Sequence, residues 1–172
     1  MVDLIDEIDF KASEVLNAKG GSGALGNAFK QGLRDQDMLL TESDADEQLL
    51  VTIKFKSKVK LHSILINGPS DGRAPMKVKL FANRIGLGFD DAESGAAEQT
   101  LEFEEGDERF DTRMELKFVK FQQVETLSFF VESNVGDEET SALTCVKFWG
   151  TQVATTNMSE FKRVAGKVGE GD

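Results

Sequence analysis

The chain has one histidine, His62, and one cysteine, Cys145, and these are the residues most suited to nucleophilic chemistry. A Cys-His or Ser-His-Asp mechanism needs its base within hydrogen-bond reach of the nucleophile. We expect His62 in mid-strand, on the face of Ile64 and Ile66, and Cys145 on another strand. His62 is therefore interpreted as a packed or rim histidine and Cys145 as an inert, small hydrophobic residue. One His and one Cys cannot supply the usual ligand set of zinc, and a CxxC pair is absent.

A glycine-rich string, Gly21-Ser22-Gly23-Ala24-Leu25-Gly26, fits the GxGxxG pattern of dinucleotide-binding folds. The residues before it, 15–19, are too polar and too few for a buried parallel strand, and no βαβ unit follows. A P-loop would need Lys and Ser or Thr where Asn27 and Ala28 stand. We therefore predict that residues 20–27 form a flexible glycine-rich surface loop and bind no phosphate.

Four carboxylates gather in the string Thr41-Glu42-Ser43-Asp44-Ala45-Asp46-Glu47. Calcium prefers several oxygen ligands, but the EF-hand pattern fails because the string has no glycine at its sharp turn and no flanking helices. A solvated turn before the first long strand is the favoured interpretation. A partner contact and a loose cation site remain as alternatives. The sequence thus assigns no catalytic residue, no cofactor and no metal ligand.

Composition restricts the partners and the compartment. The 172 residues carry a formal net charge of −11 without a compact basic stripe, which disfavours nucleic acid and anionic membranes as partners. No apolar run approaches the roughly 20 residues that span a bilayer. The first nine residues contain four carboxylates and do not resemble a secretory signal. The unpaired cysteine suits a reducing compartment, so we expect the cytoplasm, the nucleus or both.

The hydrophobic pattern from Glu47 to Val153 alternates with period two, as half-buried strands do. Strands are predicted at 49–55, 59–67, 77–82, 100–104, 114–121, 127–132 and 142–153, with Lys56-Ser57-Lys58 as an interruption between the first two. Short helical turns are expected at 13–17 and 89–93, and at 158–164 with Asn157 as its cap. The sequence lacks the long helices of βαβ crossovers. We therefore predict an all-β, two-sheet jelly-roll sandwich.

We expect one domain over residues 1–172, with 165–172 as a frayed tail. Thirteen Phe and no Tyr indicate a dry aromatic core, in which we also place the chain's single tryptophan, Trp149.

Several strings resemble the PITH family, the proteasome-interacting domain of thioredoxin-like proteins, in order and spacing from about Asp3 to Gly169. The strings are Leu40-Thr41-Glu42-Ser43-Asp44-Ala45-Asp46-Glu47-Gln48-Leu49-Leu50, Asn67-Gly68-Pro69, Val119-Lys120-Phe121-Gln122, Ser133-Asn134-Val135-Gly136-Asp137-Glu138-Glu139-Thr140, Gly150-Thr151-Gln152-Val153 and Thr156-Asn157-Met158-Ser159-Glu160-Phe161-Lys162-Arg163-Val164. The resemblance implies a jelly roll similar to galactose-binding domains and association with the 26S proteasome regulatory particle. Because CxxC and a thioredoxin domain are absent, the chain looks like a stand-alone PITH protein.

Three functional hypotheses follow. The first is a non-catalytic adaptor that binds a protein partner, which the resemblance implies to be the proteasome regulatory particle, through loops at one end of the sandwich and a C-terminal segment. In that segment Phe161, Lys162, Arg163 and Lys167 combine an aromatic anchor with cations. A helix that merely covers a sheet is the equally weighted alternative for these residues.

The second hypothesis, by fold analogy, is a module that binds a carbohydrate or small ligand. The third and weakest is a thiol enzyme. No oligomeric state is assigned, and a monomer is favoured.

Overall fold

The structure is a computed structural model that describes residues 2–29, 40–104 and 113–153, and it is built mainly of antiparallel strands. The strands are β1 (Val2–Asp3), β2 (Glu14–Leu16), β3 (Thr41–Glu42), β4 (Leu49–Asn67), β5 (Pro75–Ala82), β6 (Gln99–Glu102), β7 (Met114–Glu115), β8 (Val124–Asn134), β9 (Ala142–Leu143) and β10 (Cys145–Gln152). The helical segments among the described residues are η1 (Ile5–Glu7), η2 (Gly21–Leu25), α1 (Gly26–Phe29), α2 (Phe89–Ser94) and η4 (Phe118–Lys120). The predicted all-β jelly-roll sandwich is confirmed.

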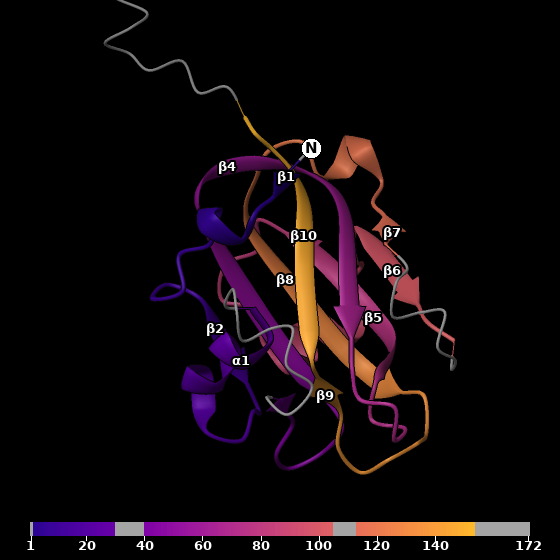
Figure 1. Ribbon diagram of the computed structural model, residues 1–172. Helices are drawn as coiled ribbons and strands as arrows, with labels where there is room; N and C mark the ends of the chain where they lie inside the picture. The colour runs from indigo at the N-terminus through magenta and orange to yellow at the C-terminus, as the bar shows by residue number, and fades with distance from the viewer. Residues whose placement is uncertain (1, 30–39, 105–112, 154–172) are drawn as a thin grey trace, which may run out of the picture.

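The long strand β4 belongs to both layers of the sandwich. Its first part pairs with β8, from Leu49 to Lys54, and its second part pairs with β10, from Val59 to Asn67. The register with β8 shifts between these two parts, and β4 arches over one end of the molecule there (Figure 1). The interruption predicted at residues 56–58 is therefore wrong. The chain stays extended and changes its pairing partner, so one hydrogen-bonded sheet folds over itself.

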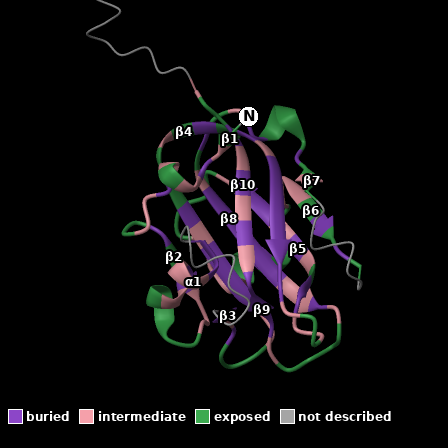
Figure 2. Ribbon diagram, viewed as in Figure 1, coloured by how far each residue is buried: buried purple, intermediate pink, exposed green. Residues whose placement is uncertain are grey.

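Phenylalanine side chains fill the space between the layers. Phe29 of α1 stacks on Phe148 of β10 with ring centroids 5.8 Å apart, and it also contacts Phe129 of β8 at 6.2 Å. Phe55 also meets Phe148, edge-on, with ring centroids 5.9 Å apart. These four rings are all buried, and Figure 2 shows the buried stretches running along the central strands. The dry aromatic core predicted from the composition is present.

Two predictions for the N-terminal region are wrong. Residues 13–17 do not form a helix, because residues 14–16 pair as β2 with β4 and bury Val15. Residues 20–27 do not form a loop, because Gly21–Leu25 and Gly26–Phe29 form consecutive helical turns. Burial of Leu25 and Phe29 in the main core explains these turns. The tail expected at 165–172 lies outside the described residues.

The predicted strand at 114–121 is shorter than expected. β7 has two residues, and the side chain of Gln99 takes the place of a further strand partner. Its Nε2 donates to the carbonyl of Glu115 at 3.1 Å, and its Oε1 accepts from the N–H of Lys117 at 2.7 Å. The chain then turns into η4, which leaves Phe118 and Val119 exposed. In the described part of the chain, no helix has the length and hydropathy to cross a membrane.

Candidate functional site

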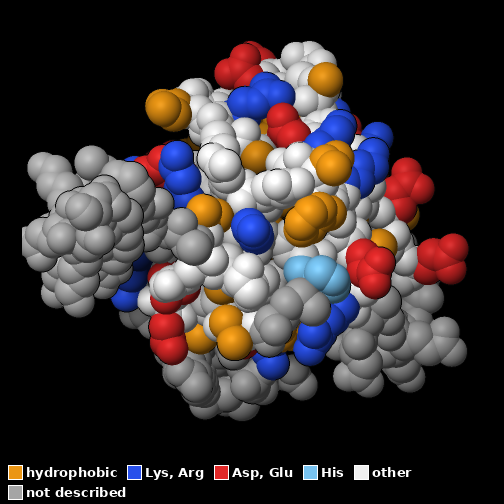
Figure 3. Space-filling view, turned by 90° about the horizontal axis from the view of Figure 1, so that it is seen from above, with side chains coloured by type: hydrophobic (Ala, Val, Ile, Leu, Met, Phe, Trp, Pro, Cys, Tyr) orange, Lys and Arg blue, Asp and Glu red, His pale blue; other side chains and the backbone are white. Residues whose placement is uncertain are grey.

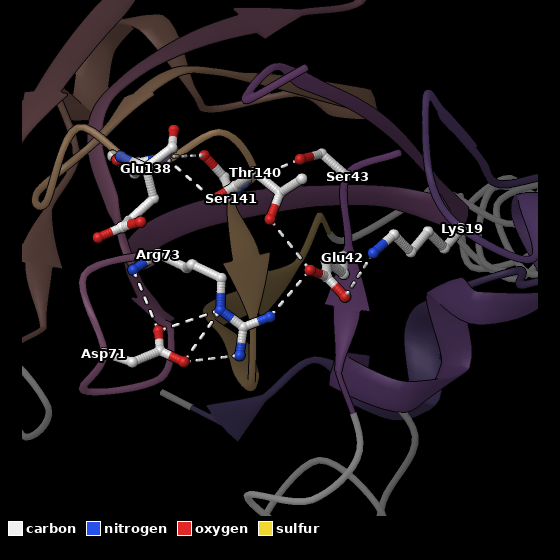
Figure 4. Close-up of polar contacts among 9 residues, drawn as sticks. Lys19, Glu42, Ser43, Asp71, Arg73, Glu138, Thr140 and Ser141 are labelled. Atoms are coloured by element: carbon white, nitrogen blue, oxygen red, sulfur yellow. Dashed lines mark hydrogen bonds and ion pairs between the residues drawn. The ribbon is translucent and has the colours of Figure 1, made fainter. Parts of the chain in front are cut away.

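A polar network joins four segments at the end of the sandwich opposite the β4 arch (Figure 4). We call it the loop-end network, and it comprises Lys19, Glu42, Ser43, Asp71, Arg73, Asn134, Glu138, Thr140 and Ser141. Most of these residues come from two of the strings on which the family resemblance rests, 40–50 and 133–140. Segments up to 98 residues apart in the sequence meet there.

Arg73 is the central cation of the loop-end network. Its Nε donates to both carboxylate oxygens of Asp71 at 3.0 Å, and its Nη2 donates to Oδ2 at 2.7 Å. Its Nη1 donates to Oε2 of Glu42 at 2.9 Å. The hydrogen bonds with Arg73 hold the pKa of Asp71 below its ordinary value, and those with Asp71 and Glu42 raise the pKa of Arg73 despite partial burial. The fork of donors therefore fixes the turn at residue 71 against β3.

Glu42 accepts from three other segments. Besides Arg73, its carboxylate accepts from Oγ1 of Thr140 at 3.0 Å and pairs with Nζ of Lys19 at 3.3 Å. Partial burial acts to raise the pKa of Glu42, but Thr140, Lys19 and Arg73 together hold that pKa below its ordinary value. The carboxylate is therefore ionised and engaged at neutral pH.

Beneath these charges, a layer of smaller groups holds β3 to the loop that precedes β9. Ser43 and Ser141 are fully buried. The N–H of Ser43 donates to the carbonyl of Ser141, and the N–H of Ser141 donates to Oγ of Ser43, both at 2.8 Å. The buried Asn134 donates from Nδ2 to Oγ of Ser141 and to the carbonyls of Glu138 and Thr140 at 3.0–3.2 Å. Its Oδ1 accepts from the N–H of Glu138 at 2.7 Å. The loop is thus fixed from inside.

Asn17 fixes the acidic turn in a similar way. It adopts a positive φ of 66°. Its Nδ2 donates to Asp46 Oδ1 at 2.8 Å and to the carbonyl of Gln48 at 2.7 Å, and its Oδ1 accepts from the N–H of Ala45 at 3.0 Å. The carboxylates of Asp44 and Asp46 remain exposed. The solvated turn predicted for residues 41–47 is present at residues 44–47 only, because Thr41 and Glu42 form β3 and Thr41 and Ser43 are buried.

The loop-end network holds the loops in position, and its charged side chains pair with one another to do this. Arg73 and Glu42 are satisfied by each other and by their neighbours. Among the residues that the structure describes, no three His, Cys, Asp or Glu side chains are arranged to hold a metal ion. The loose cation site that the sequence left open therefore finds no support in the described residues. What the arrangement offers a partner is a rigid loop surface.

The two reactive-looking residues do not meet. Cys145 lies opposite Asn67 at one end of the β4–β10 pair, whereas His62 lies near Trp149 and Gly150. Five residues of strand separate His62 from Asn67, a distance of roughly 16 Å. Both side chains are half-buried, and Nδ1 of His62 lies 3.2 Å from Oγ of its neighbour Ser63. His62 is therefore a rim residue, but a shift in register between Trp149 and Gly150 takes it off the face of Ile64 and Ile66.

Trp149 is not in the core. It is half-buried on the outer face of β10, and the guanidinium of Arg113 lies 3.9 Å from the centre of its ring. Its neighbours in β10, Val146 and Phe148, take the inner positions. One face of the tryptophan is therefore occupied by a cation of the same chain.

The sequence analysis missed Arg73, Asn17 and the structural role of Asn134. A signal existed for Asn17, which follows a short apolar run and belongs to a residue type that tolerates positive φ. Nothing local distinguishes Arg73 from other surface arginines, since its partner Glu42 is 31 residues away. The proposed partner-binding residues Phe161, Lys162, Arg163 and Lys167 lie outside the described residues.

Solved structures support the fold class. A structure of the CBM32-1 and CBM32-2 domains of Clostridium perfringens ZmpB, in complex with GalNAc, superimposes with a TM-score of 0.60. The match covers 86% of this chain and 35% of that chain, at 13% sequence identity. The chain is thus a jelly-roll sandwich of the galactose-binding-like type.

Sequence comparison identifies the family. The PITH domain profile matches residues 1–166, and the chain belongs to the PITH domain family. Thioredoxin-like protein 1 of Schizosaccharomyces pombe is 40% identical over 79% of this chain and 48% of its own length. PITH domain-containing protein GA19395 of Drosophila pseudoobscura pseudoobscura is 39% identical over 80% of this chain and 64% of its own length. The chain therefore spans about half to two thirds of the length of these curated relatives.

Proposed function

We propose that the chain is a non-catalytic protein-interaction module that binds the regulatory particle of the 26S proteasome, in the cytoplasm or the nucleus. Membership of the PITH family supports an interaction module. The proteasome as partner is what the sequence resemblance implies. The structural observation that supports the non-catalytic part of the proposal is the loop-end network, in which family-string residues such as Glu42 and Thr140 are bonded to each other within the chain. Because these polar groups bond to one another, they hold the loops in place for contact with a partner and are not available as reactive groups.

The C-terminal residues Phe161, Lys162, Arg163 and Lys167 are proposed as contacts of this partner. The described chain leads toward them from Val153, whose N–H donates to the carbonyl of Lys58 at 3.0 Å. That point lies at the β4 arch, opposite the loop-end network (Figure 1). Val153, where the described chain stops, is therefore remote from the loop-end network.

Direct binding to purified 26S proteasome tests the proposal. We expect the tagged full chain to retain the proteasome on a column in near-stoichiometric amount. Combined substitution of Phe161→Ser, Lys162→Glu, Arg163→Glu and Lys167→Glu should weaken this retention with an unchanged melting temperature, while Lys11→Glu should not. A full chain that retains no proteasome at micromolar concentration contradicts the proposal.

Carbohydrate binding is supported less well. A surface hollow of about 330 Å³ is lined by residues such as Thr52, Lys54, Arg84 and Ile85, but no aromatic ring lines it. Sugar-sized ligands are usually held against apolar and aromatic side chains. The tryptophan that could stack on a sugar, Trp149, is covered by Arg113. A titration of tryptophan fluorescence with a panel of sugars should therefore stay flat.

A further inference from the structure

Two large apolar side chains are exposed side by side in η4. Phe118 is 58% exposed and Val119 is 79% exposed. In contrast, five successive residues of β8, 127–131, are fully buried. η4 packs beside the second part of β4, since the N–H of Leu61 donates to the carbonyl of Phe121 at 2.9 Å. An exposed apolar pair of this kind is a common feature of surfaces that bind a partner.

Exposed lysines surround the apolar pair. Lys117 and Lys120 flank it in sequence, and Lys58 and Lys60 project from the adjacent part of β4. We call these six residues, Lys58, Lys60, Lys117, Phe118, Val119 and Lys120, the η4 patch. In Figure 3, which views this end of the molecule, hydrophobic and cationic side chains lie next to one another, together with the single histidine.

The four lysines of the η4 patch form a group without carboxylate partners among the described residues. Within the described ranges, no ion pair joins any of the four to Asp or Glu. Elsewhere in those ranges the pairs are Lys19–Glu42, Lys54–Glu125, Arg73–Glu42, Arg73–Asp71, Lys77–Glu132 and Arg84–Glu98. In a chain with 31 acidic and 20 basic residues, a group of unpaired cations is available to an acidic partner.

The patch is held rigid from below. Leu116 and Phe121, which border η4 on both sides, are buried, at 8% and 0% exposure. The N–H of Leu116 donates to the carbonyl of His62 at 2.9 Å, so both ends of the turn are bonded to β4. A partner that binds here therefore orders little of the protein, which reduces the entropic cost of association.

The spacing of the lysines suits an extended chain. Lys58 and Lys60 are two residues apart on a strand, and both are exposed. Side chains at i and i+2 of a strand are roughly 6.6 Å apart along it. An extended peptide with a carboxylate at every second residue has the same repeat, so successive carboxylates on one face of the peptide could meet both lysines.

From these contacts we infer that the η4 patch binds an extended acidic segment of a protein partner, in which carboxylates meet the lysines and an apolar residue packs on Phe118 and Val119. The inference rests on the proposed function, because it names the surface that an interaction module of this kind would use. A nucleic acid or an anionic membrane would also favour cations. A phosphate backbone has no apolar side chain to pack on Phe118 and Val119, and an anionic membrane would face much of a chain with a net charge of −11, whereas a short segment meets only the patch.

A labelled peptide in which five glutamates alternate with four leucines provides the probe. We expect the full chain to bind it, with an affinity that falls as salt rises from 50 to 300 mM. Phe118→Ser and Lys120→Glu should each weaken binding about tenfold. The matched controls Ile85→Ser and Lys11→Glu change an exposed isoleucine and an exposed lysine elsewhere, and should bind as the wild type does.

Several outcomes overturn the inference. Equal binding by the patch variants and the wild type shows that the peptide binds elsewhere. Binding to phosphatidylserine vesicles or to single-stranded DNA through the patch, without binding to the peptide, assigns the patch to a different class of partner. Absence of binding to the peptide at low salt also contradicts it.

Proteasome retention by the same variants separates this inference from the proposed function. If the wild type and the patch variants retain the proteasome equally, the proposed function stands and the inference fails. If the peptide binds through the patch while the proteasome is not retained, the inference stands and the proteasome is not the partner.

Discussion

At the scale of single residues, the carboxylate of Glu42 connects the largest number of separate segments in the loop-end network. It accepts from Arg73 and Thr140 and pairs with Lys19, and its side chain is 21% exposed. Hydrogen bonds to a partly buried charge stabilise a protein more than exposed ion pairs do. The stability of the loop end should therefore depend on this carboxylate and on its ionisation.

We predict that Glu42→Gln lowers the free energy of unfolding by about 1.5 kcal/mol at pH 7, because a neutral amide replaces a charged acceptor. Urea unfolding of the two proteins measures the difference. The control Glu93→Gln changes an exposed glutamate outside the network and should have an effect below about 0.5 kcal/mol. Equal losses in both variants would show that the network has no special contribution.

The same pair of proteins should show a defined pH dependence. The pKa of Glu42 in the folded state is below its ordinary value of 4.5, so the ionised form favours folding. This contribution is complete above pH 4.5 and is lost as the pH falls through the folded-state pKa. The difference in stability between wild type and Glu42→Gln should therefore be constant from pH 7 to pH 5 and shrink below pH 4.5. A difference that grows on acidification contradicts the assignment.

Asn17 combines backbone and side-chain roles that substitutions can separate. Asn17→Ala removes three hydrogen bonds and puts alanine, which tolerates positive φ less well than asparagine, at a φ of 66°. We therefore expect the free energy of unfolding to fall by about 2–3 kcal/mol. Asn17→Gly loses the same bonds without the backbone strain and should lose less. Chemical denaturation ranks the two variants. The reverse order would show that the positive φ is not costly here.

At the scale of elements, a close contact between β10 and β4 explains why a glycine stands at position 150, in one of the family strings. A Cβ on Gly150 of β10 would overlap the carbonyl oxygen of Lys60 in β4, where the register shifts. We predict that Gly150→Ala costs at least about 2 kcal/mol or prevents folding, as judged by thermal melting. Gly23→Ala is the control, because nothing lies within 4 Å of its Cβ position. Similar melting temperatures for the two variants would argue against a tight β4–β10 contact.

Periodicity predicted most of β5, where the buried Val78 and Leu80 alternate with the half-buried Lys77 and Lys79. It failed at residues 114–121, because the same alternation continues through Phe118 although the side chain of Gln99 ends β7. It also failed at residues 56–58, where polar residues mark a change of pairing partner and the strand continues. Both errors have one cause: a local pattern carries no information on which segment lies alongside.

The candidate site shows the same limit more strongly. The strings that identify the family could be read from the sequence, but the contact of Arg73 with Glu42 depends on the turn at residue 71 lying beside β3. The pairing of β3 with β9 brings together residues about 100 positions apart. Trp149 was placed in the core because tryptophan is large and apolar, but Val146 and Phe148 take the inner face of β10, so alternation puts Trp149 on the outer face, where Arg113 covers it.

At the scale of the whole molecule, charge is distributed unevenly between the two ends. The loop end carries five exposed carboxylates and the exposed Lys19, and the arch end carries the four lysines of the η4 patch and the exposed Glu115; the five carboxylates are Asp44, Asp46, Asp137, Glu138 and Glu139. This arrangement should orient an approaching acidic partner toward the arch.

We therefore predict that the association rate with the acidic peptide falls several-fold in Lys117→Glu combined with Lys120→Glu, and that it falls with rising salt. Asp44→Asn combined with Glu139→Gln should change the rate little at physiological ionic strength, because the loop end lies beyond the Debye length of about 8 Å. Stopped-flow fluorescence measures both rates. A larger effect from the loop-end pair would place the binding surface at the opposite end of the sandwich.

Crosslinking mass spectrometry from native lysate, with a lysine-reactive reagent and the full chain, tests the account most directly. It should connect Lys58, Lys60, Lys117 or Lys120 to subunits of the proteasome regulatory particle, in acidic segments of those subunits. Crosslinks confined to Lys11 and Lys19, or a set of partners without the proteasome, would contradict it.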